Sequence, residues 1–188
     1  MTTGANHTHK HPSVTQVIGR YADFSMIPEE VLSMASERGT IVHAVCASYA
    51  LGLPYMRRIP ENCLGYIDSF KNWFDRHVSD VLAVEKRFFD EQLGFHGQPD
   101  FILVMKSEGP VLVDLKTPAV LQKLWRLQLA AYKHLSTKIG KYGIRKAGSL
   151  RLFPNGNTAR MDWYDKMEAY DFNVFLCMLQ VEKFINSR

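Results

Sequence analysis

Three short stretches decide the fold and follow one another in a fixed order: Gly97-Gln98-Pro99-Asp100, Asp114-Leu115-Lys116 and Gln128-Leu129-Ala130-Ala131-Tyr132. The first two lie in apolar runs typical of β-strands, and residues 107–110 between them have turn composition. The third belongs to a helical pattern that follows directly. Two carboxylates and a lysine on one hairpin, with a polar helix beside them, can form a metal-dependent phosphodiesterase site.

The hairpin residues suit this chemistry by type and spacing. Asp100 and Asp114 lie at the same end of their strands and could share one or two divalent ions, since Mg²⁺ prefers oxygen ligands and keeps several waters. Residues i and i+2 of a strand face the same side, so Lys116 points with Asp114 while Leu115 points into the core and leaves its carbonyl for the metal. Lys116 would polarise the attacking water and stabilise developing charge. The alternative for an Asp-x-Lys triplet, which occurs only here in the chain, is a surface salt bridge.

The helix after the hairpin carries two polar residues on one face. Gln128 and Tyr132 are four residues apart and therefore adjacent on the helix surface. They either line the substrate cleft, where they contact DNA phosphate or hold the active-site carboxylates, or Tyr132 packs in the core with its hydroxyl satisfied.

Two further residues are candidates for the metal shell. His43 follows Arg38-Gly39-Thr40 in the first long helical pattern, and its imidazole would allow Mn²⁺ beside Mg²⁺. A lone helical histidine is otherwise a satisfied core or surface residue. Glu85 precedes the hairpin and is either a carboxylate ligand acting through water or a strand-edge charge.

The basic residues are concentrated beside these motifs. The net charge is +4, yet the segment from Leu115 to Met161 contains no Asp or Glu and ten Lys or Arg residues. Among these, Lys123 and Arg126 flank the Gln128 helix face and are predicted to bind substrate. Phosphate contacts supply most nucleic-acid affinity, so the block predicts a DNA-binding surface. The alternative is a solvated basic face.

Length and composition indicate one folded domain. Of the 188 residues, 46% are hydrophobic and 22% charged; residues 1–15 are predicted to be a flexible tail and 16–188 a single domain. No apolar run reaches the roughly 20 residues that span a bilayer, and the N-terminus lacks a secretory signal. Cys46, Cys63 and Cys177 are widely spaced, which favours reduced, buried thiols and a cytoplasmic location over disulfides or a metal cluster.

The periodicity predicts an α/β protein with a small central sheet and helices packed on it. The expected helices cover residues 28–51, 60–77, 120–139 and 168–185. The expected strands cover residues 81–89, 97–104, 111–115, 150–153 and 159–164.

Taken together, the motifs resemble those of the PD-(D/E)xK nuclease superfamily, and more narrowly its RecB-like, phage-type exonuclease branch. The resemblance is carried by Glu85, Gly97-x-x-Asp100, Asp114-x-Lys116 and Gln128-x-x-x-Tyr132, and by the similarity of residues 27–43 to the opening helix of phage-type members. It extends over residues 27–135. It implies a restriction-endonuclease-like core, a small central mixed β-sheet flanked by helices.

The resemblance also implies an activity: Mg²⁺- or Mn²⁺-dependent cleavage of DNA, from an end, in recombination, repair or phage genome processing. The implied metal shell consists of Asp100, Asp114, the Leu115 carbonyl, His43 and Glu85. Lys116 would be the catalytic lysine, and Gln128 and Tyr132 would contact substrate or order the site. Three scattered cysteines exclude the four-cysteine iron–sulfur cluster of some relatives.

The partners expected are DNA and, because the chain has no helicase motor, a recombination or single-strand-binding protein; no membrane is expected. Two alternatives stay open. One is a non-catalytic DNA-binding or assembly module on a nuclease fold. The other is a nuclease that acts on RNA or branched DNA, because a basic surface binds any polyanion.

Overall fold

A mixed five-stranded sheet forms the centre of the computed structural model, which describes residues 11–118, 122–164 and 166–187. The strand order is β1-β4-β5-β6-β7, and only the β5–β6 pair is parallel. The strands are β1 (Val78–Val84), β4 (Phe101–Met105), β5 (Gly109–Lys116), β6 (Lys146–Arg151) and β7 (Arg160–Trp163). The prediction of an α/β fold with a small mixed sheet flanked by helices is confirmed.

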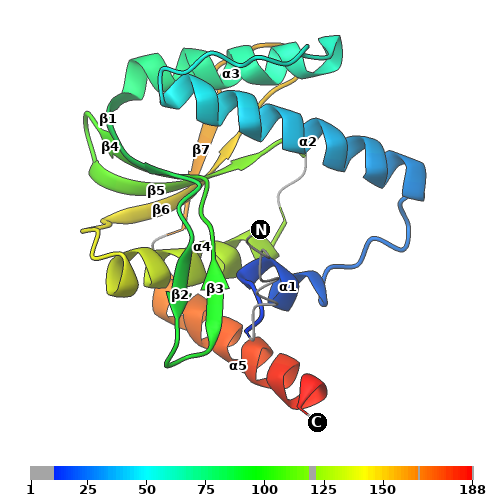
Figure 1. Cartoon of the computed structure of the whole chain (residues 1–188), viewed down its shortest axis with the longest axis vertical. Helices are drawn as coiled ribbons and strands as arrows, with labels where there is room; N and C mark the ends of the chain where they lie inside the picture. The colour runs from blue at the N-terminus through cyan, green and yellow to red at the C-terminus, as the bar shows by residue number, and fades with distance from the viewer. Residues whose placement is uncertain (1–10, 119–121, 165, 188) are drawn as a thin grey trace, which may run out of the picture.

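Helices cover both faces of this sheet (Figure 1). On one face lie α2 (Glu29–Ala50) and α3 (Glu61–His77), each beginning directly after a proline with acidic residues in the first turn. On the other lie α4 (Leu124–His134), α5 (Glu168–Asn186) and the short α1 (Val14–Gly19). None of the helices within the described ranges is both long and apolar enough to cross a membrane.

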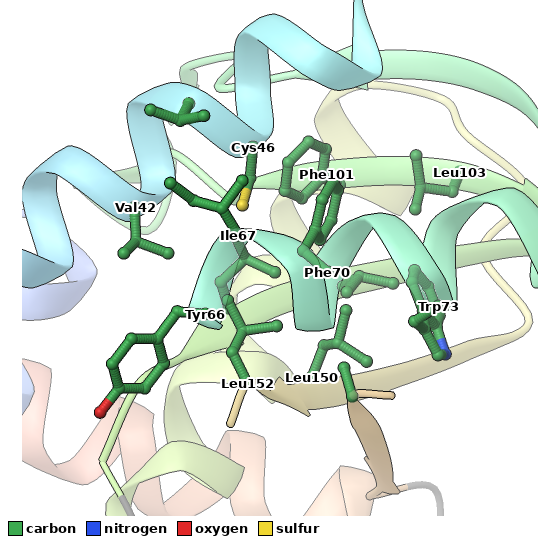
Figure 2. Packing of buried hydrophobic residues seen from close by; sticks show 14 of the residues in the cluster. Val42, Cys46, Tyr66, Ile67, Phe70, Trp73, Phe101, Leu103, Leu150 and Leu152 are labelled. Atoms are coloured by element: carbon green, nitrogen blue, oxygen red, sulfur yellow. The ribbon is translucent and has the colours of Figure 1, made fainter. Parts of the chain in front are cut away.

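Strand alternation divides the interior into two apolar layers. Val111, Val113 and Leu115 of β5 face the layer under α2 and α3, which Figure 2 shows from close by, with Phe70 and Phe101 stacked at 5.5 Å. Leu112 faces the layer under α4 and α5. Asp114 and Lys116 have the parity of Leu112, so their side chains lie on the α4 side of the sheet.

The region before the hairpin differs from the prediction. The strand expected over residues 81–89 is interrupted at Glu85, whose φ is 46° and whose N–H donates to the Asp100 carbonyl at 2.8 Å. The chain then forms a separate hairpin of β2 (Phe88–Asp90) and β3 (Phe95–Gly97). The strand expected over 97–104 is therefore also divided, with Asp100 directly before β4.

The predicted tail and the helix predicted over residues 120–139 also have other boundaries in the structure. The predicted tail reached residue 15, but α1 begins at Val14, which is fully buried, and Ser13 caps the helix. The structure describes residues 11–15 as part of the fold, while residues 1–10 lie outside the described part. The helix expected over 120–139 is α4 followed by a short π-helix, η1 (Leu135–Ile139), and its first two residues lie outside the description. Cys177 is exposed, not buried as expected.

Candidate active site

The two hairpin carboxylates face each other across neighbouring strands. In β4–β5 the antiparallel register pairs Phe101 with Val113. One step further, the same register sets Asp100 opposite Asp114, at the end of the sheet where β4 begins and β5 ends. Directly opposed residues have Cβ atoms about 5 Å apart, which places both carboxylates within reach of one ion.

Asp100 is held by one residue from each side of the site. His43 of α2 places its Nδ1 3.1 Å from Asp100 Oδ1, and the Leu115 N–H donates to Asp100 Oδ2 at 2.7 Å. His43 therefore reaches across the α2 side of the sheet to a residue 57 positions away in sequence. The structure brings together the histidine and the aspartate that the sequence pattern had selected independently.

Asp114 is held by a chain of contacts from the opposite face. Lys116 Nζ lies 2.5 Å from Asp114 Oδ2 and donates to Gln128 Oε1 at 2.8 Å. The amide of Gln128 in turn donates to Asp114 Oδ1 at 3.4 Å and to the Tyr132 hydroxyl at 3.3 Å. Gln128 and Tyr132 thus order the carboxylate and lysine, as one of the two readings of this helix face predicted. Tyr132 is also buried, as the other reading predicted.

One residue of the site has no signal as a motif. The ring of Trp125, one turn before Gln128 on α4, lies 5.4 Å from Lys116 Nζ and is buried. Its spacing of three residues from Gln128 places it on the same helix face, which is the signal that could have found it. The ring limits the positions open to the ammonium group and attracts its positive end.

The electrostatics favour one negative charge over two in the carboxylate pair. Burial raises the pKa of Asp100, but the positive His43 and the bonds from His43 and Leu115 outweigh it and lower the pKa overall. Burial also raises the pKa of Asp114; Lys116 opposes this, the charge of Asp100 adds to it, and the pKa stays raised. Burial lowers the pKa of His43, yet the two aspartates raise it above its ordinary value of 6.5.

The donor atoms fit a Mg²⁺ or Mn²⁺ ion. Asp114 Oδ2 is buried and, among the described residues, has no hydrogen-bond donor in good geometry, although Lys116 neutralises it. The Leu115 carbonyl faces the same strand edge as its N–H, toward Asp100. Two carboxylates, a carbonyl and an imidazole are ligands that these ions accept.

In the arrangement shown, however, His43 and Lys116 occupy the carboxylate oxygens. Within the described ranges no three His, Cys, Asp or Glu side chains gather closely enough to hold an ion. A bound ion would therefore displace at least one of these two contacts.

The remaining predicted site residues lie elsewhere or have other partners. The side chain of Glu85 is exposed, and only its backbone approaches Asp100. Arg126, predicted to bind substrate, forms a two-pronged ion pair with the buried Asp171 of α5, with bonds of 2.8 and 3.1 Å. This guanidinium is engaged within the molecule, and its binding to substrate stays a prediction. Lys123 is exposed directly before α4.

In the folded protein, most cations of the basic block (residues 115–161) are paired with carboxylates. Six of its ten cations form ion pairs with carboxylates: Lys116, Arg126, Lys133, Lys146, Arg151 and Arg160. All six pair with acids that lie outside the block by sequence; for Lys116 the acid is Asp114, directly before the block. The prediction of one continuous basic surface is therefore reduced to its four other cations.

The comparisons with known proteins do not assign this chain to a family. Neither the protein-family models nor the curated proteins gave a match to this chain.

Proposed function

We propose that this protein is a metal-dependent deoxyribonuclease of the PD-(D/E)xK type that hydrolyses DNA phosphodiester bonds. The observation that supports this most is the pairing of Asp100 and Asp114 across the β4–β5 hairpin with Lys116 on the same face as Asp114. Three separate motifs converge there with His43 and Gln128. A preference for DNA ends rests on the resemblance to phage-type exonucleases.

Each residue has a role that follows from its surroundings. Asp100, Asp114, His43 and the Leu115 carbonyl would hold Mg²⁺ or Mn²⁺, which when bound neutralises phosphoryl charge and activates water. Asp100 stays ionised because its pKa is lowered. Lys116, positioned by Gln128 and Trp125, presents its ammonium group to the attacking water or to the phosphoryl oxygens.

A cavity lies beside the site on the β2–β3 side and reaches it at Tyr132. It has a volume of about 640 Å³ and includes Gly97, Gln98 and Tyr132 in its lining, together with Arg87 and Gln16. The side chains of Gln16, Arg87 and Gln98 carry hydrogen-bond donors that suit phosphate and sugar oxygens. Tyr132 connects the cavity to Gln128.

The test compares an end-labelled linear duplex with the same sequence as a closed circle, each with Mg²⁺, Mn²⁺ or EDTA. We expect loss of label from the linear DNA only, in Mg²⁺ or Mn²⁺ and not in EDTA. Labelled RNA and a branched duplex run in parallel identify a different substrate. Cutting of the circle would replace the exonuclease with an endonuclease.

Salt-sensitive binding without cleavage of any substrate in either metal would contradict the nuclease. It would favour a non-catalytic DNA-binding module instead.

A further inference from the structure

Arg38 of α2 is an arginine whose charge has no acidic partner beside the candidate active site. Its guanidinium carbon lies 5.3 Å from the centre of the Tyr66 ring. Its Nε is buried without a hydrogen-bond acceptor, and among the residues that the structure describes it forms no ion pair. Burying an N–H group without an acceptor costs stability. The terminal N–H groups of the same guanidinium have no acceptor among the described residues either, and these are the groups that can bind one from outside the chain.

Other cations around the site differ from Arg38 in this respect. Lys116 pairs with Asp114, Arg126 with Asp171 and Arg151 with Asp162. Each of these charges is neutralised within the molecule. The charge of Arg38 has no such partner among the described residues and is left for a ligand.

The position of Arg38 places it at the edge of the site. A Cβ added at Gly39, the next residue, would lie 3.9 Å from Thr117 Oγ1, and Thr117 directly follows Lys116. Gly39 and His43 lie on one face of α2, four residues apart. Arg38 and His43 are five positions apart, which is a rise of about 7.5 Å along the helix, comparable to the spacing of neighbouring phosphates in an extended strand.

Tyr66 holds the guanidinium and offers a second donor. Figure 2 shows its ring at the margin of the packed layer, with the hydroxyl directed away from Val42, Ile67 and Phe70. The ring is buried, while the hydroxyl has no hydrogen-bond partner in the described part of the chain. An aromatic face under a guanidinium restricts its orientation before any ligand binds.

We propose that Arg38, supported by Tyr66, binds a backbone phosphate of the DNA strand next to the bond that is cut. A guanidinium forms two parallel hydrogen bonds to phosphate oxygens, which lysine does not reproduce. This inference rests on the proposed nuclease function for its substrate. It adds a contact that orients the strand on the α2 side, opposite the Gln128 side.

The test measures binding of a fluorescein-labelled DNA oligonucleotide of about 20 nucleotides by anisotropy, in EDTA so that nothing is cut. Arg38→Met keeps the apolar stem on Tyr66 and removes the charge; we expect affinity to fall about ten- to a hundred-fold. The slope of log affinity against log salt should become shallower by about 0.7 to 0.9. Arg38→Lys should restore the slope and only part of the affinity.

Two further variants separate binding from folding. Arg57→Met makes the same change at an exposed arginine beyond the far end of α2, and should bind DNA as wild type does. Tyr66→Phe removes only the hydroxyl and should weaken binding less than Arg38→Met. Unchanged affinity and slope in Arg38→Met, in a variant that melts as wild type does, would overturn the proposal, and so would a loss equal in Arg57→Met.

The outcome for Arg38 is distinguishable from that for the nuclease. Binding that depends on Arg38 in a protein that cuts nothing would support the phosphate site and reject the proposed activity. Metal-dependent cleavage with an unchanged KM in Arg38→Met would do the reverse. A wild-type protein that binds no DNA would overturn the phosphate site.

Discussion

Lys116 is the residue whose surroundings give the sharpest functional prediction. Its ammonium group contacts Asp114 at 2.5 Å and Gln128 at 2.8 Å and lies over Trp125, so its place is fixed from three directions. We expect Lys116→Met to lower kcat on linear DNA about 100- to 1,000-fold or more, because a fixed cation at developing charge contributes about that much. DNA affinity in EDTA should change less than about three-fold, since the charge of Lys116 is already neutralised by Asp114.

The matched control for this prediction is Lys138→Met in η1, where the lysine is exposed. It should cut DNA at the wild-type rate. Turnover of Lys116→Met within a few-fold of wild type would show that the lysine is structural.

Replacing Asp114 should have different effects on the stability of the metal-free protein and on its stabilisation by a metal ion. Its pKa is raised from the ordinary value of 3.8, first by burial and, against Lys116, by Asp100. A carboxyl whose pKa is higher in the folded state stabilises the fold below pH 3.8, and this contribution is lost as pH rises through the raised pKa. In EDTA at neutral pH, Asp114→Asn should therefore melt no lower than wild type, and wild type alone should lose stability over that window.

Millimolar Mg²⁺ should reverse the order by stabilising wild type and not the variant, as thermal unfolding with and without the ion would show. Asp100→Asn is the contrasting control. The pKa of Asp100 is lowered, so its stabilisation is present at neutral pH and the variant should melt lower. If Mg²⁺ raised the melting temperature of Asp114→Asn and of wild type equally, the metal would not bind this carboxylate.

At the scale of elements, Gly97 connects the β2–β3 hairpin to the site. A methyl group there would lie 2.7 Å from Tyr132 Cε1 and 2.9 Å from Leu135 Cδ1. Tyr132 would have to move, and with it the Gln128 amide that holds Asp114. We expect Gly97→Ala to lower kcat about ten-fold, with DNA affinity in EDTA less affected, because small displacements of positioning groups reduce rate strongly.

Gly143→Ala is the control for Gly97, since nothing lies within 4 Å of the added methyl group and the residue is exposed. Both variants would be compared by initial cleavage rates on linear DNA. Equal rates in the two would show that Tyr132 does not position the site.

Gly65 tests how closely α3 packs on the turn before β7. A Cβ there would lie 1.8 Å from the Pro154 carbonyl oxygen, which is backbone and has little freedom to move. In an isolated helix glycine to alanine stabilises by about 1 kcal/mol, but here we expect Gly65→Ala to destabilise by about 3 kcal/mol or more. Urea unfolding measures the change in the free energy of unfolding. Gly39→Ala is the control in α2: the nearest contact of the added Cβ, 3.9 Å, is an ordinary one, so this substitution should stabilise the protein.

Features of the fold could be predicted from the sequence where they depend on neighbouring residues, and could not where they depend on residues far along the chain. The α2 and α3 boundaries were predicted nearly to the residue because prolines and first-turn acids are local signals. The break at Glu85 was not, since its positive φ is fixed by a bond to Asp100, fifteen residues on. Apolar residues end at Val84 and resume at Phe88, and the charged run Glu85-Lys86-Arg87 between them does not by itself show that the two parts belong to separate sheets.

The candidate site divides in the same way. Asp100, Asp114 and Lys116 were predicted because hairpin register and strand alternation are periodic. The engagement of Arg126 was not, because its partner Asp171 lies 45 residues away on another helix. A run of like charge in sequence does not show which of its members meet acids from elsewhere in the fold.

For the whole molecule, this pairing sets how strongly DNA binding depends on salt. If all ten cations of the basic block met phosphates, log affinity would fall with log salt with a slope of about −9. Six are paired, and the described residues leave Lys123, Lys138, Lys141 and Arg145 without an ion pair.

With Arg38 added to these four, we expect a slope between about −3 and −5 for a duplex in EDTA, because a cation that stays paired within the protein neutralises no phosphate and releases no counterion from the DNA. Anisotropy titrations from about 50 to 200 mM salt would measure it. Asp171→Asn, which frees Arg126, is the matched variant: a steeper slope would show that this guanidinium can reach DNA once released. A wild-type slope near −9 would mean that the ion pairs open on binding, and that the charge block acts as one surface after all.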